Sequence, residues 1–266
     1  MYRVLEVTTV TGCKVGCLYC PQHKFAKAHS QASRRVRLDL DVFRKCLSTV
    51  PNDVDISFAG YAEPWLNSEC TDMVEHASER GHGLRIFSTL VGMSVGDMSR
   101  LAKLDVKLFV VHLFDSGQFM RTRYVDDEYL YKLTFLVQLK IPKIRFLLFG
   151  ELHPEIKRIV PPEAIVTSRP LISRASNVDP NVVHQPSTVS GALRCVESRE
   201  YRNVLLPNGD VTLCCMDYER RHVIGNLLCS TYDELHNGEE FQNILRMMNG
   251  ANGFLICRHC EYAARK

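Results

Sequence analysis

The sequence predicts an α/β fold in which a parallel sheet forms a partial, open (β/α)5-6 barrel, followed by a small cysteine-rich segment. Short β-branched runs alternate with helical patterns through the first two-thirds of the 266 residues, as expected for β–α–β units and a parallel sheet. About five or six such units are present, short of the eight in a closed barrel. After about residue 175 the periodicity ends, and a second group of cysteines lies between positions 195 and 260.

The strands are predicted from apolar, β-branched runs and the helices from apolar residues at helical spacing. Strands are expected over residues 4–10, 54–59, 84–88, 106–113, 144–149 and 164–167. Helices are expected over residues 40–49, 70–80, 95–104 and 127–138. The basic stretch 24–37 is interpreted as a solvated loop, with contact to an anionic substrate as the alternative. The Asn-, Pro- and Ser-rich stretch 177–188 is interpreted as a linker. Two domains are therefore expected, over residues 1–180 and 188–266.

Composition limits the class of protein. A net charge of +3 and a charged fraction of 24% give no strong signal for nucleic-acid or membrane-surface binding. The first ten residues alternate polar and apolar side chains, unlike a signal peptide, and no run has the length of a transmembrane helix. Eleven cysteines without a secretory signal indicate metal or redox chemistry in a reducing compartment. The expected location is the cytoplasm.

The segment TGCKVGCLYC follows the first predicted strand directly and brings Cys13, Cys17 and Cys20 into one short loop. Three thiolates bind a soft metal centre and leave one coordination position unfilled. Structural zinc sites are usually closed by four ligands, whereas cysteine thiolates hold iron–sulfur clusters. The triplet therefore predicts a cluster with one open iron. The alternatives are incidental cysteines or a zinc site with a distant fourth ligand.

This C-x3-C-x2-C spacing, with the aromatic Tyr19 before the last cysteine, resembles the signature of the radical S-adenosylmethionine superfamily. The resemblance implies that Cys13, Cys17 and Cys20 hold a [4Fe-4S] cluster. Its fourth iron would bind the amino and carboxylate groups of S-adenosyl-L-methionine. Tyr19 would then pack beside the adenine of this cosubstrate, and its alternative role is to fill the core.

The segment GYAEP follows the second predicted strand and resembles the glycine–glutamate–proline motif of this superfamily, which meets the methionine ammonium. A carboxylate or exposed strand-end carbonyls are suitable acceptors for that ammonium. The departure from the family pattern is an alanine where a second glycine is common, and the alternative is an ordinary turn. The expected cosubstrate contacts are Gly60, Tyr61, Ala62, Glu63 and Pro64.

Ser88 and Thr89 follow the third predicted strand and resemble the position that contacts the ribose or carboxylate of the cosubstrate. Leu90 and Val91 stand where Asn-Gly is frequent in the family, and the competing interpretation of the two hydroxyls is a helix cap. Functional residues collect at the carboxyl ends of parallel strands. All three motifs are therefore expected on the same rim of the sheet.

Two further residues are predicted to meet the substrate. His112 ends the fourth predicted strand, and its alternative role is that of a hydrogen-bonded core histidine. Arg174 lies in the segment SRASN, which resembles a segment of radical enzymes with a cysteine-rich C-terminal extension. Its planar guanidinium suits a carboxylate or a substrate oxygen, and the competing interpretation is a surface arginine.

The C-terminal cysteines surround a predicted β-hairpin whose Asn208-Gly209 pair fits a tight turn. One cysteine precedes the hairpin, two follow it, and a C-x2-C pair comes late. This arrangement resembles the SPASM/twitch extension, and family spacing favours Cys214 over Cys215. The implied ligands of a second, auxiliary [4Fe-4S] cluster are Cys195, Cys214, Cys257 and Cys260. A zinc site of four cysteines has the same ligand chemistry and is the alternative.

The resemblance spans nearly the whole chain and implies a compact two-cluster enzyme similar to the 2-deoxy-scyllo-inosamine dehydrogenases. An electron would enter the first cluster and cleave S-adenosylmethionine reductively. The resulting 5′-deoxyadenosyl radical would remove hydrogen from a C–H bond of a polar small molecule. The second cluster would accept the electron of the substrate radical, which makes the reaction a two-electron oxidation. Its alternative role is to anchor the extension or an electron path. The implied electron donor is a reductase such as flavodoxin or ferredoxin.

Other functions are compatible with the same residues. One is a radical peptide maturase, and another is a redox-neutral rearrangement of a small amine or modified nucleoside, so that a peptide or nucleotide substrate is not excluded. The alternative outside enzymology is a zinc- or cluster-binding module. Formation of 5′-deoxyadenosine under reducing, anaerobic conditions separates this last alternative from the others.

Overall fold

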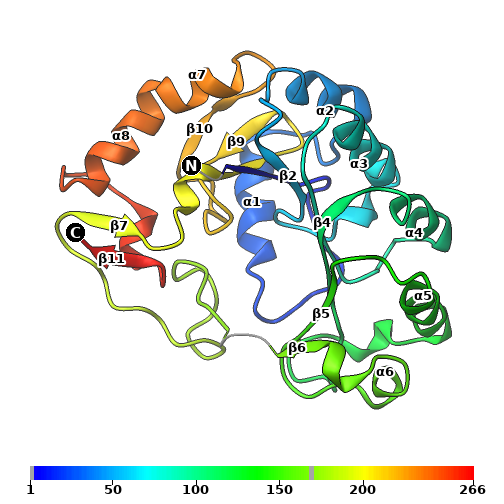
Figure 1. Cartoon of the computed structure of the whole chain (residues 1–266). Helices are drawn as coiled ribbons and strands as arrows, with labels where there is room; N and C mark the ends of the chain where they lie inside the picture. The colour runs from blue at the N-terminus through cyan, green and yellow to red at the C-terminus, as the bar shows by residue number, and fades with distance from the viewer. Residues whose placement is uncertain (1–2, 168–170) are drawn as a thin grey trace.

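The computed structural model of the chain describes residues 3–167 and 171–266 and has one large sheet with helices on its outer side (Figure 1). Within the described residues the sheet has the strand order β10-β9-β8-β1-β2-β3-β4-β5-β6, and its two end strands do not pair with each other. Neighbouring strands from β1 to β6 are parallel. The barrel is therefore open, as predicted. The strands of this part are β1 (Val4–Val7), β2 (Asp55–Phe58), β3 (Leu84–Ser88), β4 (Val106–His112), β5 (Ile144–Leu148) and β6 (Ile165–Thr167).

Strands from the C-terminal part of the chain extend the same sheet. β8 (Arg202–Leu205) pairs with β1 in parallel, and β9 (Asp210–Thr212) and β10 (Val223–Asn226) continue it as antiparallel neighbours. The predicted hairpin is confirmed: β8 and β9 are joined by a turn in which Gly209 has a φ of +86°. β7 (Leu193–Cys195) and β11 (Ala263–Arg265) form a separate two-stranded sheet. The segments on either side of the predicted boundary thus share one sheet.

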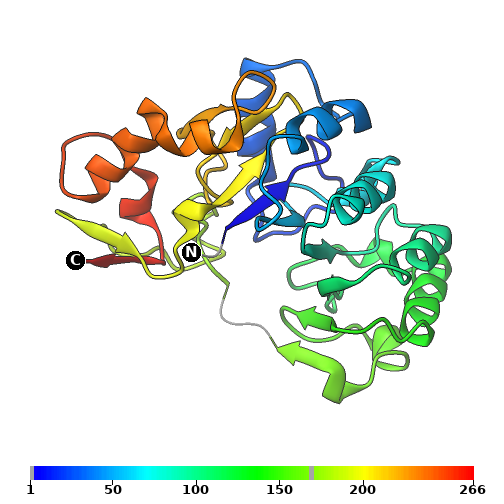
Figure 2. The same cartoon turned by 45° about the horizontal axis from the view of Figure 1, so that its top comes forward.

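Helices cover the outer side of the parallel strands (Figures 1 and 2). The helical residues that face the sheet are apolar, and Phe43, Met73 and Leu133 are fully buried. None of the described helices is long and apolar enough to cross a membrane. The helices are α1 (Gln22–Ala32), α2 (Leu40–Leu47), α3 (Cys70–Glu79), α4 (Val95–Leu101), α5 (Asp127–Gln138), α6 (Pro154–Lys157), α7 (Tyr232–Asn237) and α8 (Glu239–Met248).

Two sequence predictions are corrected. The stretch 24–37 was expected to be a loop, but most of it belongs to α1. Phe25 and His29 lie one helical turn apart and are fully buried, so a narrow apolar stripe is enough to hold this basic helix. The first strand was expected to reach residue 10. β1 ends at Val7, and Val10 forms only an isolated bridge with Arg37.

The two faces of the sheet differ in polarity. Residues paired in register on parallel strands share a face, and Glu6 pairs with Ser57, which pairs with Arg85. Arg145 pairs with Val110, two residues before His112 on β4. These residues therefore point away from the apolar face that packs on the helices. We call the side with Glu6, Ser57 and His112 the inner face.

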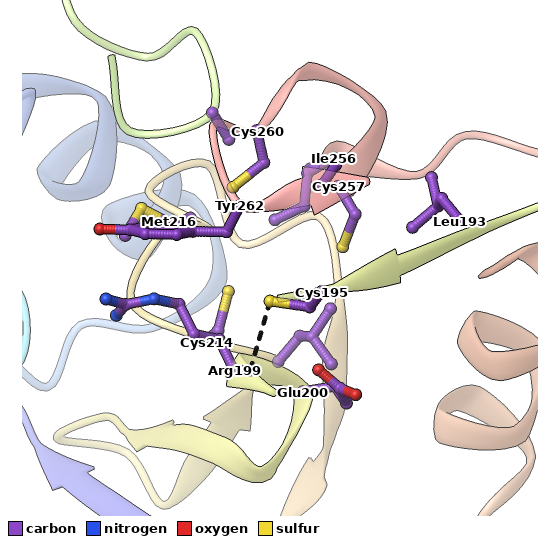
Figure 3. A pocket seen from close by; sticks show the side chains of 13 residues that line it. Leu193, Cys195, Arg199, Glu200, Cys214, Met216, Ile256, Cys257, Cys260 and Tyr262 are labelled. Atoms are coloured by element: carbon purple, nitrogen blue, oxygen red, sulfur yellow. Dashed lines mark hydrogen bonds between the residues drawn. The ribbon is translucent and has the colours of Figure 1, made fainter. Parts of the chain in front are cut away.

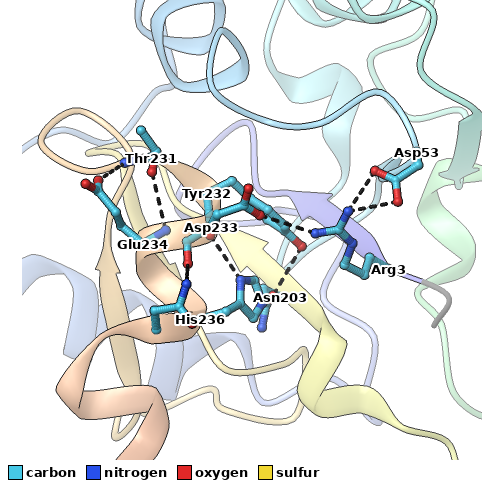
Figure 4. A network of polar contacts seen from close by, with 9 residues as sticks. Arg3, Asp53, Asn203, Thr231, Tyr232, Asp233, Glu234 and His236 are labelled. Carbon is cyan, nitrogen blue, oxygen red and sulfur yellow. Dashed lines mark hydrogen bonds and ion pairs between the residues drawn. The ribbon is translucent and has the colours of Figure 1, made fainter.

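The C-terminal helices are tied to the start of the chain by polar contacts (Figure 4). The Arg3 guanidinium lies 2.7 Å from the Asp53 carboxylate and 3.4 Å from that of Asp233 in α7. The Thr231 side chain caps the N-terminus of α7. These contacts join α7 to Arg3, the residue that precedes β1.

Candidate functional site

The three cysteines of the first motif lie on the loop between β1 and α1, at the carboxyl end of the first strand. Gly12 and Gly16 have φ values of +89° and +69°, so the loop uses backbone conformations that favour glycine. Burial, together with the neighbouring Cys20 and Cys13 thiols, raises the pKa of the Cys17 thiol to about 12. The structure thus brings Cys13, Cys17 and Cys20 together.

These three thiols fit a positively charged metal centre. Thiols with raised pKa values stay protonated at neutral pH when no cation is near them, and metal binding deprotonates them. The Cys20 backbone amide donates to the Cys17 carbonyl at 3.1 Å, which turns the chain tightly between these two cysteines. Three thiols on one tight loop leave a fourth position open, as an iron–sulfur cluster that also binds a cosubstrate requires.

Tyr19 lies beside this loop and is buried. Its ring packs on Phe149, with the ring centroids 4.7 Å apart, and the His112 ring lies on the same Phe149 at 6.1 Å. Burial raises the pKa of Tyr19, and its hydroxyl hydrogen-bonds to the Cys17 thiol. Tyr19 therefore connects the cysteine loop to the end of β4, and its contact with adenine stays a prediction.

The second and third motifs form one hydrogen-bonded unit. The Glu63 carboxylate accepts hydrogen bonds from the Ser88 hydroxyl at 2.7 Å, the Thr89 amide at 2.6 Å and the Thr89 hydroxyl at 2.7 Å. The backbone amide of Glu63 donates to the Cys13 thiol. Burial raises the pKa of Glu63, while these donors oppose the shift. All three predicted motifs therefore meet on one rim, beside Cys13.

The backbone of the second motif is sterically fixed. Gly60 has a φ of +62°, and a Cβ there would lie 2.2 Å from the Thr8 hydroxyl oxygen. The Thr9 hydroxyl donates to the Pro64 carbonyl at 2.7 Å, and Ala62 is half-buried on the rim. Only glycine fits at position 60. The loop is thereby held against the chain that leads into the cysteine triplet.

Tyr61 joins this loop to the C-terminal hairpin. Its side chain is 1% exposed, and its hydroxyl lies 2.8 Å from the Cys214 carbonyl and 3.0 Å from the Asp217 carbonyl. Its ring stacks on Phe25 of α1, with the ring centroids 4.4 Å apart. Tyr61 therefore holds the loop to the hairpin. The contact of Tyr61 with the cosubstrate stays a prediction.

The four predicted C-terminal cysteines line one pocket (Figure 3). Cys195 ends β7, Cys214 follows β9, and Cys257 and Cys260 belong to the last turn of the chain. Burial raises the pKa of Cys260 to about 12, and it also raises those of Cys214 and Cys257, with further contributions from the neighbouring thiols. These thiols fit a cationic metal centre for the same reason as the first three. The remaining lining is largely apolar and includes Leu193, Leu213, Met216, Ile256 and Tyr262.

Within residues 3–167 and 171–266, no three His, Cys, Asp or Glu side chains converge closely enough to hold a single metal ion. The four thiols instead surround the pocket from separate segments. The Cys195 sulfur accepts a hydrogen bond from the Arg199 amide at 3.4 Å (Figure 3). The assignment of the four as ligands stays a prediction.

The structure distinguishes Cys214 from Cys215. The Cys214 side chain lines the pocket, whereas Cys215 is not among the lining residues. The Cys215 sulfur instead accepts a hydrogen bond from the Arg199 guanidinium at 3.3 Å, and its thiol hydrogen-bonds to Glu6 on the inner face. This placement favours Cys214 as the ligand.

Arg174 lies between the two groups of cysteines. Burial raises the pKa of the Cys20 thiol, and the Arg174 charge opposes that shift. Burial, together with the charge of Arg174, lowers the pKa of His112 to about 4. Among the described residues, the Arg174 guanidinium has no hydrogen bond or ion pair. His112 is therefore neutral at pH 7, and Arg174 is an unpaired cation whose charge acts on it.

Several residues near these groups were not found by sequence reasoning. The Tyr218 hydroxyl lies 3.8 Å from the Cys20 sulfur, and both polar atoms of the Gln22 amide are buried without a partner among the described residues. Glu6 could have been identified from the sequence as a candidate site residue, because it is the one charged residue in the otherwise apolar strand β1. Tyr218 and Gln22 carry no such signal, since polar residues after a strand or a cysteine are common.

Comparisons with known proteins agree with this arrangement. Residues 195–261 match the SPASM family model, described as an iron-sulfur cluster-binding domain. The fold is similar to that of BtrN in complex with AdoMet and 2-DOIA, with a TM-score of 0.65 and 19% identity, over 99% of this chain and 93% of that chain. No curated protein sequence matches the chain.

Two further solved structures share the fold. One is anSMEcpe with bound AdoMet, with a TM-score of 0.59 and 12% identity over 97% of this chain and 86% of that chain. The other is Streptococcus suis SuiB bound to precursor peptide SuiA, with a TM-score of 0.55 and 13% identity over 98% of this chain and 70% of that chain. At such identities the likeness is one of fold.

These findings confirm the predicted fold class, an open α/β barrel with a small C-terminal cysteine-rich part. The family match also confirms the resemblance of the C-terminal part to the SPASM iron-sulfur cluster-binding domain, and the solved structures with a similar fold include proteins with bound AdoMet. The cofactor types named by the comparisons, iron–sulfur clusters and AdoMet, are those that the sequence predicted.

Proposed function

We propose that the chain is a radical S-adenosylmethionine enzyme that oxidises a polar small molecule by two electrons. The observation that supports this most strongly is the placement of Arg174. Its neighbour Ala175 packs in one buried cluster with Cys214 and Cys215, and Cys20 packs against that cluster. The charge of Arg174 acts on the pKa of both Cys20 and Cys215. A substrate held by Arg174 would therefore have a cluster site on either side.

The residues that would hold the cofactors follow from the two groups of thiols. Cys13, Cys17 and Cys20 would bind the first [4Fe-4S] cluster, and the unit of Glu63, Ser88 and Thr89 would meet S-adenosylmethionine. When bound, these groups supply a 5′-deoxyadenosyl radical that removes hydrogen from a C–H bond. The ligands of the auxiliary cluster, which would accept one electron, are Cys195, Cys214, Cys257 and Cys260.

Three groups of side chains near the cysteines would have separate tasks in this scheme. The Arg174 guanidinium would orient a hydroxyl or carboxylate oxygen of the substrate, because it has no other acceptor among the described residues. His112, neutral at pH 7 since its pKa is lowered to about 4, would share a hydrogen bond without adding charge. The closely packed Tyr19 and Phe149 rings would help to exclude water.

We further propose that residues 1–180 supply the radical-generating part and residues 188–266 the auxiliary part, with a reductase such as flavodoxin or ferredoxin as the electron donor. The likeness to BtrN, in complex with 2-DOIA, covers 93% of that chain with a TM-score of 0.65, whereas the likeness to SuiB, bound to a precursor peptide, covers 70% with a TM-score of 0.55. The greater likeness to BtrN supports a small-molecule substrate.

The experiment is an assay of 5′-deoxyadenosine formation by anaerobically reconstituted protein with dithionite and S-adenosylmethionine. The wild type is expected to form 5′-deoxyadenosine, and Cys17→Ala is expected to form none because the cluster loses a ligand. Cys229→Ala is the matched control, since Cys229 is exposed and lies outside both groups. Absence of product from the wild type, or product from Cys17→Ala at the wild-type rate, would refute the proposal.

A further inference from the structure

The segment that contains Arg174 has an unusual backbone. Arg174, Ala175 and Ser176 have φ values of 56°, 53° and 60°, so three successive residues with side chains adopt the left-handed conformation. Such residues visit this region singly, and a Cβ makes it unfavourable. None of the three is glycine, so surrounding contacts have to hold the run in place.

The contact that does so comes from the last turn of the chain. The Glu261 carboxylate accepts hydrogen bonds from the Ser173 amide and, at 3.4 Å, from the Ala175 amide. Amides of a chain that turns in this way point into one concave space and bind an anion. Glu261 directly follows Cys260, a predicted ligand of the auxiliary cluster.

Further bonds lock the same segment. The Ser176 amide donates to the Ser173 hydroxyl at 2.8 Å. The Asn177 side-chain amide lies 2.8 Å from the Arg174 carbonyl and 3.0 Å from the Met216 carbonyl. The segment is therefore bound to the hairpin that contains Cys214 as well as to Glu261.

The left-handed run also has one residue at each group of cysteines. Ala175 lines the pocket of the four C-terminal cysteines. It also belongs to the buried cluster against which Cys20 of the first group packs, and the charge of Arg174 acts on Cys20 and His112. A shift of this backbone would move the guanidinium relative to the first group and alter the wall of the second.

We propose that Glu261 is a positioning residue, whose carboxylate holds the left-handed run and thereby directs Arg174 toward the first group of cysteines. The role of Arg174 toward a substrate rests on the proposed function, whereas the clamp itself does not. Glu261 thus couples the auxiliary site to the place where the substrate would be oriented.

The experiment uses limited trypsin digestion of the full-length, reconstituted protein, with the Arg174–Ala175 bond followed by mass spectrometry. Glu261→Gln keeps the size of the side chain but loses the charge and one acceptor oxygen. Cleavage at this bond is expected to become at least about tenfold faster, because a backbone that opens locally is cut in proportion to its open population. Glu240→Gln, at an exposed position of α8, is the matched control and is expected to match the wild type.

A second variant separates the clamp from general destabilisation. Ala175→Gly with Ser176→Gly removes the Cβ atoms that disfavour the left-handed run. Added to Glu261→Gln, this pair is expected to restore most of the protection of the Arg174–Ala175 bond. Unchanged cleavage in Glu261→Gln, or faster cleavage that the two glycines do not reduce, would overturn the proposal. Wild-type protein that forms no 5′-deoxyadenosine but shows protection and rescue would overturn only the proposed function.

Discussion

Cys13, Cys17 and Cys20 lie on a single loop between β1 and α1, whereas Cys195, Cys214, Cys257 and Cys260 come from separate segments that meet around one pocket. The first site is local, and two glycines with positive φ shape its loop. The second exists only when the hairpin and the last turn of the chain are packed together. The first is therefore defined by backbone geometry and the second by tertiary structure.

The number of thiols in each region also predicts a different function for it. A loop site with three thiols leaves one position for a cosubstrate, while four thiols close a site and suit electron transfer or structure. Tyr61 and Arg174 are among the residues that connect the two regions, through the Cys214 carbonyl and through the segment whose amides bond to Glu261. Perturbing either region, or the link, should give different results.

The largest expected contrast is in radical formation. Cys13→Ala is expected to lower 5′-deoxyadenosine formation by more than about a hundredfold. Losing a residue that only hydrogen-bonds to a metal ligand costs up to about a hundredfold in activity, and losing a ligand itself should cost more. Cys214→Ala is expected to stay within about threefold of the wild type, since separate sites act nearly independently. Equal losses in the two variants would mean that the regions are one functional unit. Cys215→Ala serves as the neighbour control for Cys214.

The local backbone of the first region predicts the next effect. Gly60→Ala is expected to lower the free energy of unfolding by about 4 kcal/mol, because it combines a left-handed conformation with a steric clash. Gly12→Ala is the matched control, since Gly12 also has positive φ but a Cβ there would meet no atom of the described residues within 4 Å. It should cost only about 1.5 kcal/mol. Urea unfolding measures both, and equal costs would contradict the role of the Thr8 contact.

The second region should lose stability in acid through His222. Burial lowers the pKa of His222 to about 4, and its Nε2 accepts a hydrogen bond from the Ile256 amide at 3.2 Å, next to Cys257. The unfolded chain binds a proton near pH 6.5 but the folded one does not, so stability is lost as pH falls from 6.5 to 4. The loss attributable to His222 is about 3 kcal/mol.

The measurement is the unfolding free energy of the wild type and His222→Gln as a function of pH. The advantage of the wild type is expected to shrink as pH falls below 6.5. His112 has a similarly lowered pKa, but it is present in both proteins and cancels in the comparison. A difference that does not depend on pH would contradict the assignment to His222.

Removing the Tyr61 hydroxyl, which links the two regions, should change the free energy of unfolding least. Tyr61→Phe removes the hydroxyl that reaches the Cys214 and Asp217 carbonyls, and it is expected to cost about 1.5 kcal/mol of unfolding free energy. Tyr131→Phe, at a side chain that is 62% exposed, should cost nothing measurable. If the two substitutions cost the same, Tyr61 would not hold the regions together.

The same contrast explains what the sequence could predict. The parallel strands and the three rim motifs depend on patterns within short segments, and the structure has them where they were expected. α1 was missed because only Phe25 and His29 are buried in an otherwise polar helix. Neither Ala175 nor Ser176 favours positive φ, so their left-handed backbone has no sequence signal. Contacts such as that between Ser173 and Glu261 join positions 88 residues apart and appear only in the folded chain.

The central claim is that the chain holds one [4Fe-4S] cluster in each region, and the most direct test is the content of iron and acid-labile sulfide in anaerobically reconstituted protein. The wild type is expected to hold about eight iron and eight sulfide per chain. The triple variant Cys13→Ala, Cys17→Ala, Cys20→Ala should retain about four of each, all in the C-terminal site. About four iron and one zinc in the wild type would contradict the account, because the second region would then be a zinc site.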